Sequence, residues 1–350
     1  MNNFNKRIKN LPQDIWLLLN QIDELKGQWT GGAQLNPQAL GRLKRSVLVT
    51  STGASTRIEG AKLTDEEVEK LMRGLSLQKL ADRDKQEVQG YYELLDNVFK
   101  SWQNIPFTES TIKHFHKELL KYAIKDERHR GEYKKIENKV AMTDGAGKTV
   151  GVLFDPTPAY LTPKAMQELV DWTNEAFALK EIHPLFIIGN FLVEFLKIHP
   201  FQDGNGRLSR ILTNLLMLKF GYAYVPYVSH EKLIEDNKTD YYLALRQSQK
   251  TFGTDKEDTS AWVEFFLNIS LAQAKQALIL LSGENIEKLL SPKQLIVWGY
   301  LQQVMEATPG EIAKVNKVAR PTVSQALEKL LQLKKVERLG QGRTTRYKKI

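Results

Sequence analysis

The sequence of 350 residues contains no cysteine. This absence excludes disulfides, zinc sites with cysteine ligands and catalysis by a thiolate. A chain without cysteine suits a reducing compartment, and we expect a cytoplasmic protein.

Long apolar runs are also scarce. The N-terminal stretch "MNNFNKRIKN" does not lead into the apolar segment of a signal peptide. The apolar run at 185–198, "LFIIGNFLVEFLKI", is interrupted by Asn190, Glu194 and Lys197. It is shorter than the roughly 20 apolar residues that a membrane span requires. We therefore expect no membrane association.

Negative charge is rare in the last sixty residues. Residues 291–350 contain twelve Lys and Arg but only four Asp and Glu, so nearly all of the net charge of +9 lies there. This asymmetry predicts a polyanionic partner for the C-terminal part and not for the rest of the chain.

Helical periodicity dominates what is present, so the predicted fold is mainly α. The apolar spacing and the capping signals predict helices over 11–27, 38–58, 63–74, 84–101, 108–124, 163–178, 185–198, 206–219, 230–249 and 258–281. Gly27 is expected to end the first of them, and Thr64 with Glu67 forms a capping box. One hairpin is predicted, with strands over 137–142 and 148–154 around an Asp-Gly turn. A linker is expected to begin at 282–284.

Polar and flexible residues follow the most apolar helix directly, in the stretch 199–210, "HPFQDGNGRLSR". Gly204-Asn205-Gly206 allows the backbone to turn and to present the unpaired N–H groups of a new helix, which form an anion site. Arg207 and Arg210 share one face of that helix and can both bind a polyphosphate. Asp203 suits a Mg²⁺ ion that bridges phosphates. His199 has a side chain whose pKa suits proton transfer near neutrality.

The stretch therefore predicts a phosphate loop with a metal ligand and a general base beside it. It holds no nucleophile, so we expect the attacking hydroxyl to come from another molecule. The alternative interpretation is a plain corner between two helices, with His199 as a buried core residue.

"HPFQDGNGRLSR" matches the HPFx(D/E)GNGRxxR motif of Fic-domain proteins in full, and the chain resembles that family over roughly residues 50–280. "GEYKKIENKVAM" (131–142) resembles the flap of the family, and "YYLALRQSQ" (241–249) its nucleotide-side helix. The resemblance implies an all-helical core that transfers AMP from ATP to a protein hydroxyl and releases pyrophosphate.

The resemblance also implies roles for individual residues. His199 would deprotonate a Ser, Thr or Tyr of the target, and Asp203 would hold Mg²⁺ on the α- and β-phosphates. The remaining expected nucleotide contacts are the N–H groups of Gly204, Asn205 and Gly206, the side chains of Arg207 and Arg210, and, on the nucleoside side, Tyr241, Tyr242 and Gln249.

Two flap positions concern the target. The strand at Val140 would pair with an extended target segment, a mode in which main-chain bonds supply affinity. Many flaps of the family begin "GxYR", whereas position 134 is Lys here. We assign no role to Lys134 from the sequence.

The segment "STRIEG" (55–60) resembles the (S/T)xxxE(G/N) inhibitory motif that accompanies Fic cores, through Ser55, Glu59 and Gly60. By that resemblance Glu59 would pair with Arg210 and occupy the donor that should hold the γ-phosphate. In some members of the family this glutamate also positions a water that removes AMP from the target. The alternative is a solvent-exposed glutamate.

The C-terminal part resembles a winged helix. Helices are predicted over 292–306, 308–317 and 320–336, followed by a two-stranded wing around 340–342. By that resemblance the third helix would enter the major groove, which makes Arg320, Arg343 and Arg346 candidate DNA contacts. The alternative is a winged helix used only for protein contacts.

The expected organisation is an N-terminal helical region (1–105) carrying an inhibitory helix at about 48–60, a Fic core (106–285) and a winged helix domain (286–350). The predicted function is an autoinhibited protein adenylyltransferase that uses ATP and Mg²⁺, modifies a protein hydroxyl of a target or of itself, and forms a homodimer. Two alternatives remain: a DNA-binding regulator whose core only senses nucleotide, and transfer of another group such as UMP, phosphate or phosphocholine.

Overall fold

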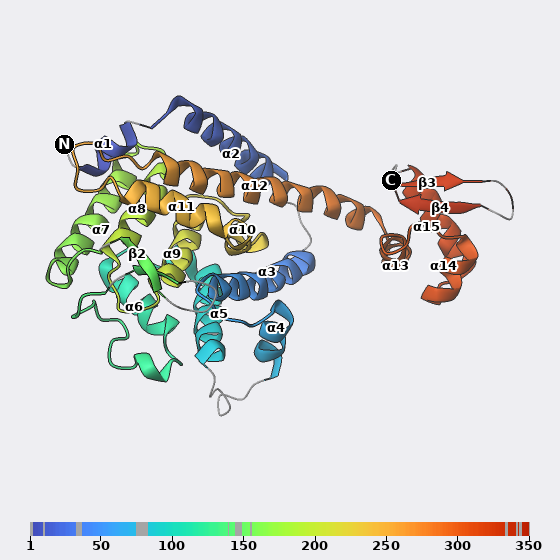
Figure 1. Cartoon of the computed structure of the whole chain (residues 1–350). Coiled ribbons are helices and arrows are strands. Elements are labelled where there is room, and N and C mark those ends of the chain that lie inside the picture. Colours follow the sequence, from blue (N-terminus) through green and yellow to red (C-terminus); the bar gives the residue numbers. More distant parts are fainter. Residues whose placement is uncertain are drawn as a thin grey trace. The chain divides into compact units, whose positions relative to one another are not determined.

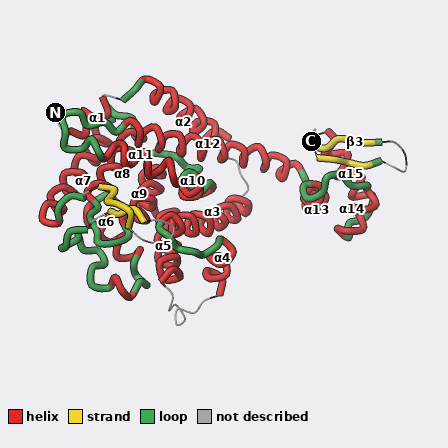
Figure 2. Tube along the Cα trace, viewed as in Figure 1, coloured by secondary structure: helices red, strands yellow, loops and turns green. Residues whose placement is uncertain are grey.

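The computed structural model describes residues 3–9, 11–32, 37–74, 83–138, 140–143, 149–154, 156–332, 335–340, 342 and 345–349. The fold is mainly α, as predicted, and the strands of the described residues form two separate hairpins (Figure 1, Figure 2). The described residues divide into two compact units, with the boundary after Ala277.

The first unit holds the helices that precede this boundary. They are α1 (Asn3–Lys9), α2 (Gln13–Gly32), α3 (Pro37–Ile58), α4 (Asp65–Gly74), α5 (Arg83–Ser101), α6 (Glu109–Leu119), α7 (Thr162–Leu179), α8 (Pro184–Ile198), α9 (Asn205–Lys219), α10 (His230–Asp236), α11 (Lys238–Gln249) and α12 (Ser260–Leu289), which continues past the boundary. Short 3-10 turns lie at Trp102–Asn104, Ile124–Asp126, Ala159–Leu161 and Val225–Tyr227.

Helix α8 forms the centre of this unit. It is predominantly apolar and largely buried, as expected for a helix in a core, and it packs against α1, α7, α9 and α11. Phe186, Phe191 and Phe195 have no exposed surface, and burial of each such side chain contributes about 1.5–3 kcal/mol. The end of α8, where His199 follows, is therefore anchored in the core.

No helix of the described residues has the length and apolar content needed to cross a bilayer.

Several predicted helix and linker boundaries were wrong. Helix α2 continues through Gly27 to Gly32, because Trp29 is buried and stacks on Tyr227 with ring centroids 5.7 Å apart. The helix predicted over 230–249 is divided into α10 and α11 at Asn237. The linker predicted from 282 is helical to Leu289, since one glycine costs a helix only about 1 kcal/mol.

The predicted hairpin of the first unit is present. Strands β1 (Val140–Thr143) and β2 (Thr149–Phe154) pair antiparallel, with Val140 opposite Phe154. The Asp-Gly turn between them lies outside the described residues.

The second unit has its own core. It contains α13 (Pro292–Leu301), α14 (Pro309–Asn316), α15 (Arg320–Gln332) and the antiparallel strands β3 (Val336–Leu339) and β4 (Arg346–Lys349). A bridge joins Ala307 to Tyr347. Its buried core includes Val297, Leu301, Ile312, Val323, Leu327 and Leu330. The first and third predicted helices were too long, because they end at Leu301 and Gln332.

Candidate active site

The loop between α8 and α9 contains two left-handed residues. His199 ends α8 with φ 50° and ψ 61°, and its N–H donates to the Phe195 carbonyl. A left-handed conformation costs a residue with a side chain free energy, so it persists only where the surroundings enforce it. Gly204 has φ 80° and directly precedes α9, a position that glycine adopts without strain. The loop therefore joins the predicted base to a helix start within a few residues.

The side chain of Asn205 closes this loop. Its Oδ1 accepts from the Phe201 N–H at 2.9 Å, and its Nδ2 donates to the Phe201 carbonyl at 2.8 Å. The amide group of Asn205 is thus used to hold the loop. The part of Asn205 that can contribute to the predicted anion site is its main-chain N–H group, which belongs to the first turn of α9.

His116 of α6 packs against the loop between α8 and α9. The sequence did not indicate this residue. Its ring stacks on Phe201 with centroids 3.8 Å apart. The Gly131 N–H donates to its Nδ1, so Nε2 carries the proton and donates to the Asp203 carbonyl at 3.0 Å. Burial lowers the pKa of His116 to about 4, so the ring is neutral at physiological pH and keeps this tautomer.

Lys134, the position that departs from the flap pattern, binds the backbone beside His199. Its ammonium group donates to the Ile198 carbonyl at 3.1 Å and to the Asn138 Oδ1 at 2.9 Å, and its N–H donates to the Pro200 carbonyl. Asn138 in turn donates to the Phe201 carbonyl. Lys134 is buried, which lowers its pKa to about 8. The two side chains therefore bind main-chain carbonyls on both sides of the left-handed His199.

The electrostatics of this corner keep His199 unprotonated. Burial and the nearby Lys134 lower the pKa of His199 to about 4, although Glu59 and Asp203 oppose the shift. A neutral imidazole can accept a proton, so His199 is in the correct form for a general base over the whole physiological pH range.

Arg210 of α9 meets the end of α3. Its Nε donates to the Ser55 hydroxyl at 2.7 Å, and its Nη2 donates to the Ser55 carbonyl at 2.9 Å and to Glu59 Oε1 at 2.8 Å. Gly60, with φ 103°, follows Glu59 and ends the helix. The pair of Glu59 with Arg210 that the resemblance implies is therefore present, although 151 positions separate the two residues.

The carboxylate of Glu59 also touches the start of α9. A Cβ atom on Gly206 would lie 2.2 Å from Glu59 Oε1 and 3.3 Å from Arg210 Nη1, so any side chain at Gly206 would have to displace the Glu59 carboxylate. Arg210 is 2% exposed, and among the described residues its Nη1 has no hydrogen-bond partner. The anionic carboxylate of Glu59 therefore lies at the start of α9. The buried Nη1 group of Arg210, which has no partner among the described residues, lies near the same position.

Arg207 and Asp203 interact with α5. Arg207 is buried, and its guanidinium lies 2.6 Å from Glu87 Oε2 and 3.0 Å from Asp203 Oδ1. Asp203 also receives Arg83, at 2.6 Å on Oδ2. Burial alone would raise the pKa of Asp203, but Arg207, the Gly204 N–H and Arg83 lower it. Asp203 is therefore ionised and places a carboxylate at the mouth of the loop.

This donor set fits a magnesium ion that enters with a nucleotide. Asp203 offers one carboxylate, and the described residues include no cluster of three His, Asp or Glu that could hold a metal by itself. Mg²⁺ is commonly held by one or two carboxylates and by substrate phosphates, with waters completing its shell. Asp203 would supply the protein ligand, beside the N–H groups of the first turn of α9.

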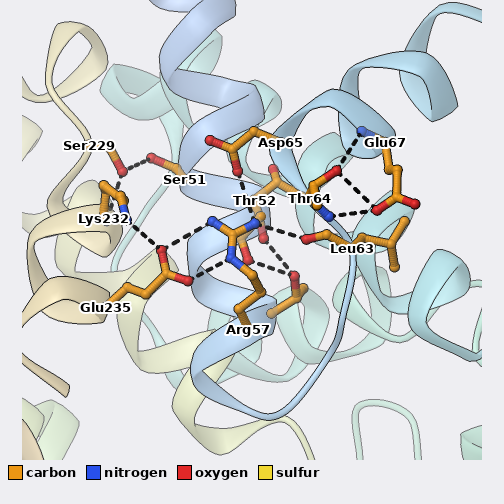
Figure 3. A network of polar contacts seen from close by, with 12 residues as sticks. Ser51, Thr52, Arg57, Leu63, Thr64, Asp65, Glu67, Ser229, Lys232 and Glu235 are labelled. Atoms are coloured by element: carbon orange, nitrogen blue, oxygen red, sulfur yellow. Dashed lines mark hydrogen bonds and ion pairs between the residues drawn. The ribbon is translucent and has the colours of Figure 1, made fainter. Parts of the chain in front are cut away.

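Arg57 fixes the end of α3 to its surroundings (Figure 3). Its guanidinium contacts both carboxylate oxygens of Glu235 on α10, at 2.6 and 3.1 Å. It also contacts the Leu63 carbonyl and Asp65, each at 2.9 Å. Arg57 is two residues before Glu59, so this network holds the segment that carries the glutamate.

The other predicted nucleotide-side residues lie on α11. Tyr241 is buried beside Trp262, and burial raises its pKa to about 12 although Arg210 opposes the shift. Tyr242 is half-buried, and Gln249 is buried. Their roles in a nucleoside pocket stay predictions.

The predicted macromolecular contacts are placed as follows. Val140 is the first residue of β1. In the second unit Arg320 is exposed at the start of α15, and Arg346 is half-exposed on β4 and paired with Glu306. Arg343 lies outside the described residues. Their contacts with a target segment or with DNA stay predictions.

Comparisons with known proteins agree with this geometry. A family model described as "Fic/DOC family" matches residues 106–217. A Fido domain-containing protein from Dictyostelium discoideum is 30% identical over 136 residues, which are 37% of this chain and 89% of that protein. The chain belongs to the Fic/DOC family.

Other members of the family are similar over smaller or more divergent regions. A probable protein adenylyltransferase from Aquifex aeolicus is 32% identical over 100 residues, 29% of this chain and 28% of that protein. The crystal structure of a Fic family protein from Desulfovibrio desulfuricans superposes with a TM-score of 0.63 at 23% identity, over 97% of both chains. The curated relative from Aquifex is thus matched over less than a third of its length, whereas the fold extends over nearly the whole chain.

Proposed function

We propose that this member of the Fic/DOC family is an autoinhibited protein adenylyltransferase, which transfers AMP from ATP to a hydroxyl group of a protein. The observation that carries the proposal is the seat of Glu59. Its carboxylate lies on Arg210 and against Gly206, where the first turn of α9 offers its N–H groups. A site that accommodates this carboxylate is suited to a phosphate, and the names of several relatives support the same activity.

The transfer would proceed as follows. The acceptor hydroxyl oxygen attacks the α-phosphorus of ATP, and the bond from that phosphorus to the β-phosphate oxygen breaks, so pyrophosphate leaves. The proton of the hydroxyl passes to the ring of His199, which burial keeps neutral. A bound Mg²⁺ would neutralise charge on the phosphates. The N–H groups of the first turn of α9 and the side chains of Arg207 and Arg210 would orient the phosphate chain.

The inhibition follows from competition for Arg210. While Glu59 occupies Nη2, a γ-phosphate cannot use that donor, and two anions at one helix start repel each other. ATP then binds in a pose that does not align the α-phosphorus with an incoming hydroxyl. Removal of the carboxylate would restore the aligned pose.

Intact-protein mass spectrometry after incubation with ATP and Mg²⁺ tests this function. We expect a mass gain of one AMP per modified site in Glu59→Gly, a weak gain in the parent, and none in Glu59→Gly with His199→Ala. A cell extract supplies target proteins in a parallel reaction. No adduct on any protein in the presence of Glu59→Gly would overturn the proposal.

A second proposal concerns the second unit, which we propose binds DNA. The proposal is supported by three short helices followed by a hairpin, and by the excess of Lys and Arg in residues 291–350. The outer face of α15 exposes Arg320, Ser324 and Gln325, which are side chains suited to phosphates and base edges. The full chain should bind duplex DNA with an affinity that falls steeply with salt, and no binding at low salt would remove the proposal.

A further inference from the structure

Four charged side chains at the mouth of the site form a closed ring. Arg83 Nη2 lies 2.6 Å from Asp203 Oδ2, Asp203 Oδ1 lies 3.0 Å from Arg207, and Arg207 lies 2.6 Å from Glu87 Oε2. Arg83 Nε lies 2.6 Å from Glu87 Oε1 and closes the ring. Arg83 and Glu87 lie on α5, whereas Asp203 lies in the loop before α9 and Arg207 in the first turn of α9. Each carboxylate in the ring therefore contacts both arginines.

The four side chains of the ring differ in solvent exposure. These differences determine which ion pair can separate at the lowest cost in free energy. The side chain of Arg207 is 2% exposed and that of Glu87 is 10% exposed, whereas Arg83 is 49% and Asp203 34% exposed. Breaking the Arg207–Glu87 pair would separate two largely buried opposite charges, which is expensive. Separation of Arg83 from Asp203 costs little, because water solvates both groups. A cation that approaches Asp203 would therefore displace Arg83 and leave Arg207 in place.

Glu87 has two effects in this arrangement. It holds the buried Arg207 in the orientation in which the guanidinium faces Asp203. It also retains Arg83 through Nε after the Arg83–Asp203 contact opens. Without Glu87, both arginines would have only Asp203 as a carboxylate partner within the ring, and Asp203 would be harder to free.

We propose that Arg83 and Glu87 form a guard pair for the metal ligand. Arg83 occupies Asp203 until a divalent cation replaces it, and Glu87 is a positioning residue that keeps Arg207 in place and receives the displaced Arg83. This inference rests on the proposed function, because it takes Asp203 as the ligand of the Mg²⁺ that accompanies ATP. It assigns α5, which lies outside the motif, a part in the metal dependence of nucleotide binding.

Calorimetric titration of ATP tests the guard pair without reference to activity. The measured quantity is the Mg²⁺ factor, defined as the dissociation constant of ATP in EDTA divided by that in saturating Mg²⁺. All variants are made in a Glu59→Gly, His199→Ala background, so that ATP can enter but is not consumed. Arg83→Met keeps most of the side-chain length but removes the charge, and it should raise the Mg²⁺ factor by roughly threefold. Glu87→Gln should lower the factor by about fivefold or more, because both arginines then turn to Asp203.

The control for a lost arginine is Arg73→Met. Arg73 lies on α4, is largely exposed, and pairs with Glu69 one turn away, as Arg83 pairs with Glu87. It should leave the Mg²⁺ factor unchanged. A factor for Arg83→Met equal to that of Arg73→Met, or a rise for Glu87→Gln, would overturn the guard pair. Arg83→Met alone suffices for this decision if Glu87→Gln unfolds at a lower temperature than its parent.

Asp203→Ala separates the two levels of the argument. It should reduce the Mg²⁺ factor below that of every other variant. If Asp203→Ala retains the factor of its background, Asp203 is not the metal ligand, and both that part of the proposed function and the guard pair are wrong. If Asp203→Ala loses the factor while Arg83→Met behaves as Arg73→Met does, only the guard pair is wrong.

Discussion

Glu59 and Glu87 each bind one of the two arginines of α9, but their surroundings differ. Glu59 follows the end of α3, has a side chain 33% exposed, and touches the start of α9 at Gly206. Glu87 lies within α5, has a side chain 10% exposed, and shares its carboxylate between Arg207 and Arg83. The partly exposed carboxylate of Glu59, at the start of α9, is suited to replacement by a phosphate. The carboxylate of Glu87 is buried and is suited to a fixed position. The same type of ion pair is therefore suited to inhibition in one place and to support in the other.

The largest expected effect on the rate of AMP transfer comes from removal of the proposed general base, His199. In the Glu59→Gly background, His199→Ala should lower the rate of AMP transfer by about 10²–10⁴-fold, which is the usual contribution of a general base. The rate is measured as pyrophosphate release at saturating ATP and Mg²⁺. ATP binding should be nearly unchanged, and a variant that retains the parental rate would show that another group accepts the proton.

The two glutamates should differ in the sign of their effect. Glu59→Gly should raise the initial rate of AMP transfer by more than about tenfold, equivalent to about 1.4 kcal/mol of barrier. Glu87→Gln should lower it, because Arg207 loses the carboxylate that orients it. Both rates are measured at one ATP concentration with the same acceptor protein. Rates that rise in both variants would mean that Glu87 also inhibits.

The restraint on Glu59 can also be tested through Arg57. This residue holds the segment that carries Glu59 against α10 (Figure 3). Arg57→Met should raise the transfer rate by roughly threefold, because a partly buried ion pair that restrains Glu59 is lost. In the Glu59→Gly background the same substitution should add nothing. Lys232→Met is the matched control, since the Lys232 ammonium group also binds Glu235 and its other ion pair, with Asp236, lies on the same helix α10. An equal rise in the control would assign the effect to α10 and not to the inhibitory segment.

The smallest effect concerns pH. The pKa of His199 is about 4 when Glu59 is present, and the negative charge of Glu59 raises it. Removal of Glu59 should therefore lower that pKa, and kcat/KM of Glu59→Gly should stay constant on acidification from neutrality until about pH 5. The profile is measured by pyrophosphate release between about pH 4 and 8. A fall centred on the ordinary histidine pKa of about 6.5 would contradict the buried, neutral base.

The local parts of the site could be predicted from the sequence because they are contiguous. The residues from His199 to Arg210 lie in one loop and one helix turn, so their types and spacing already indicate a phosphate site. The partner of Arg210 came only from the resemblance of 55–60 to a known motif. No local pattern indicates His116, Lys134, Arg83 or Glu87, because each reaches the site through packing of another helix or of the flap segment.

The helix ends that were predicted wrongly have a similar cause. Gly27 favours a helix end, but contacts of Trp29 with Tyr224 and Tyr227 from a distant segment extend α2. Conversely, the predicted capping box at Thr64 is present, and Thr308 forms a second one with Glu311, since such boxes depend on residues three apart. Boundaries set by local hydrogen bonds could be predicted, and those set by tertiary contacts could not.

The central claim is that Glu59 and the γ-phosphate of ATP compete for Arg210. The most direct measurement is the ratio of the dissociation constants of ADP and ATP, determined by calorimetry in Mg²⁺ for the parent and for Glu59→Gly. In the parent the γ-phosphate lacks its donor, so the ratio should be close to one. In Glu59→Gly the ratio should rise by about fivefold or more, as expected for a charge-assisted contact with a buried arginine. Equal ratios in the two proteins would contradict the account.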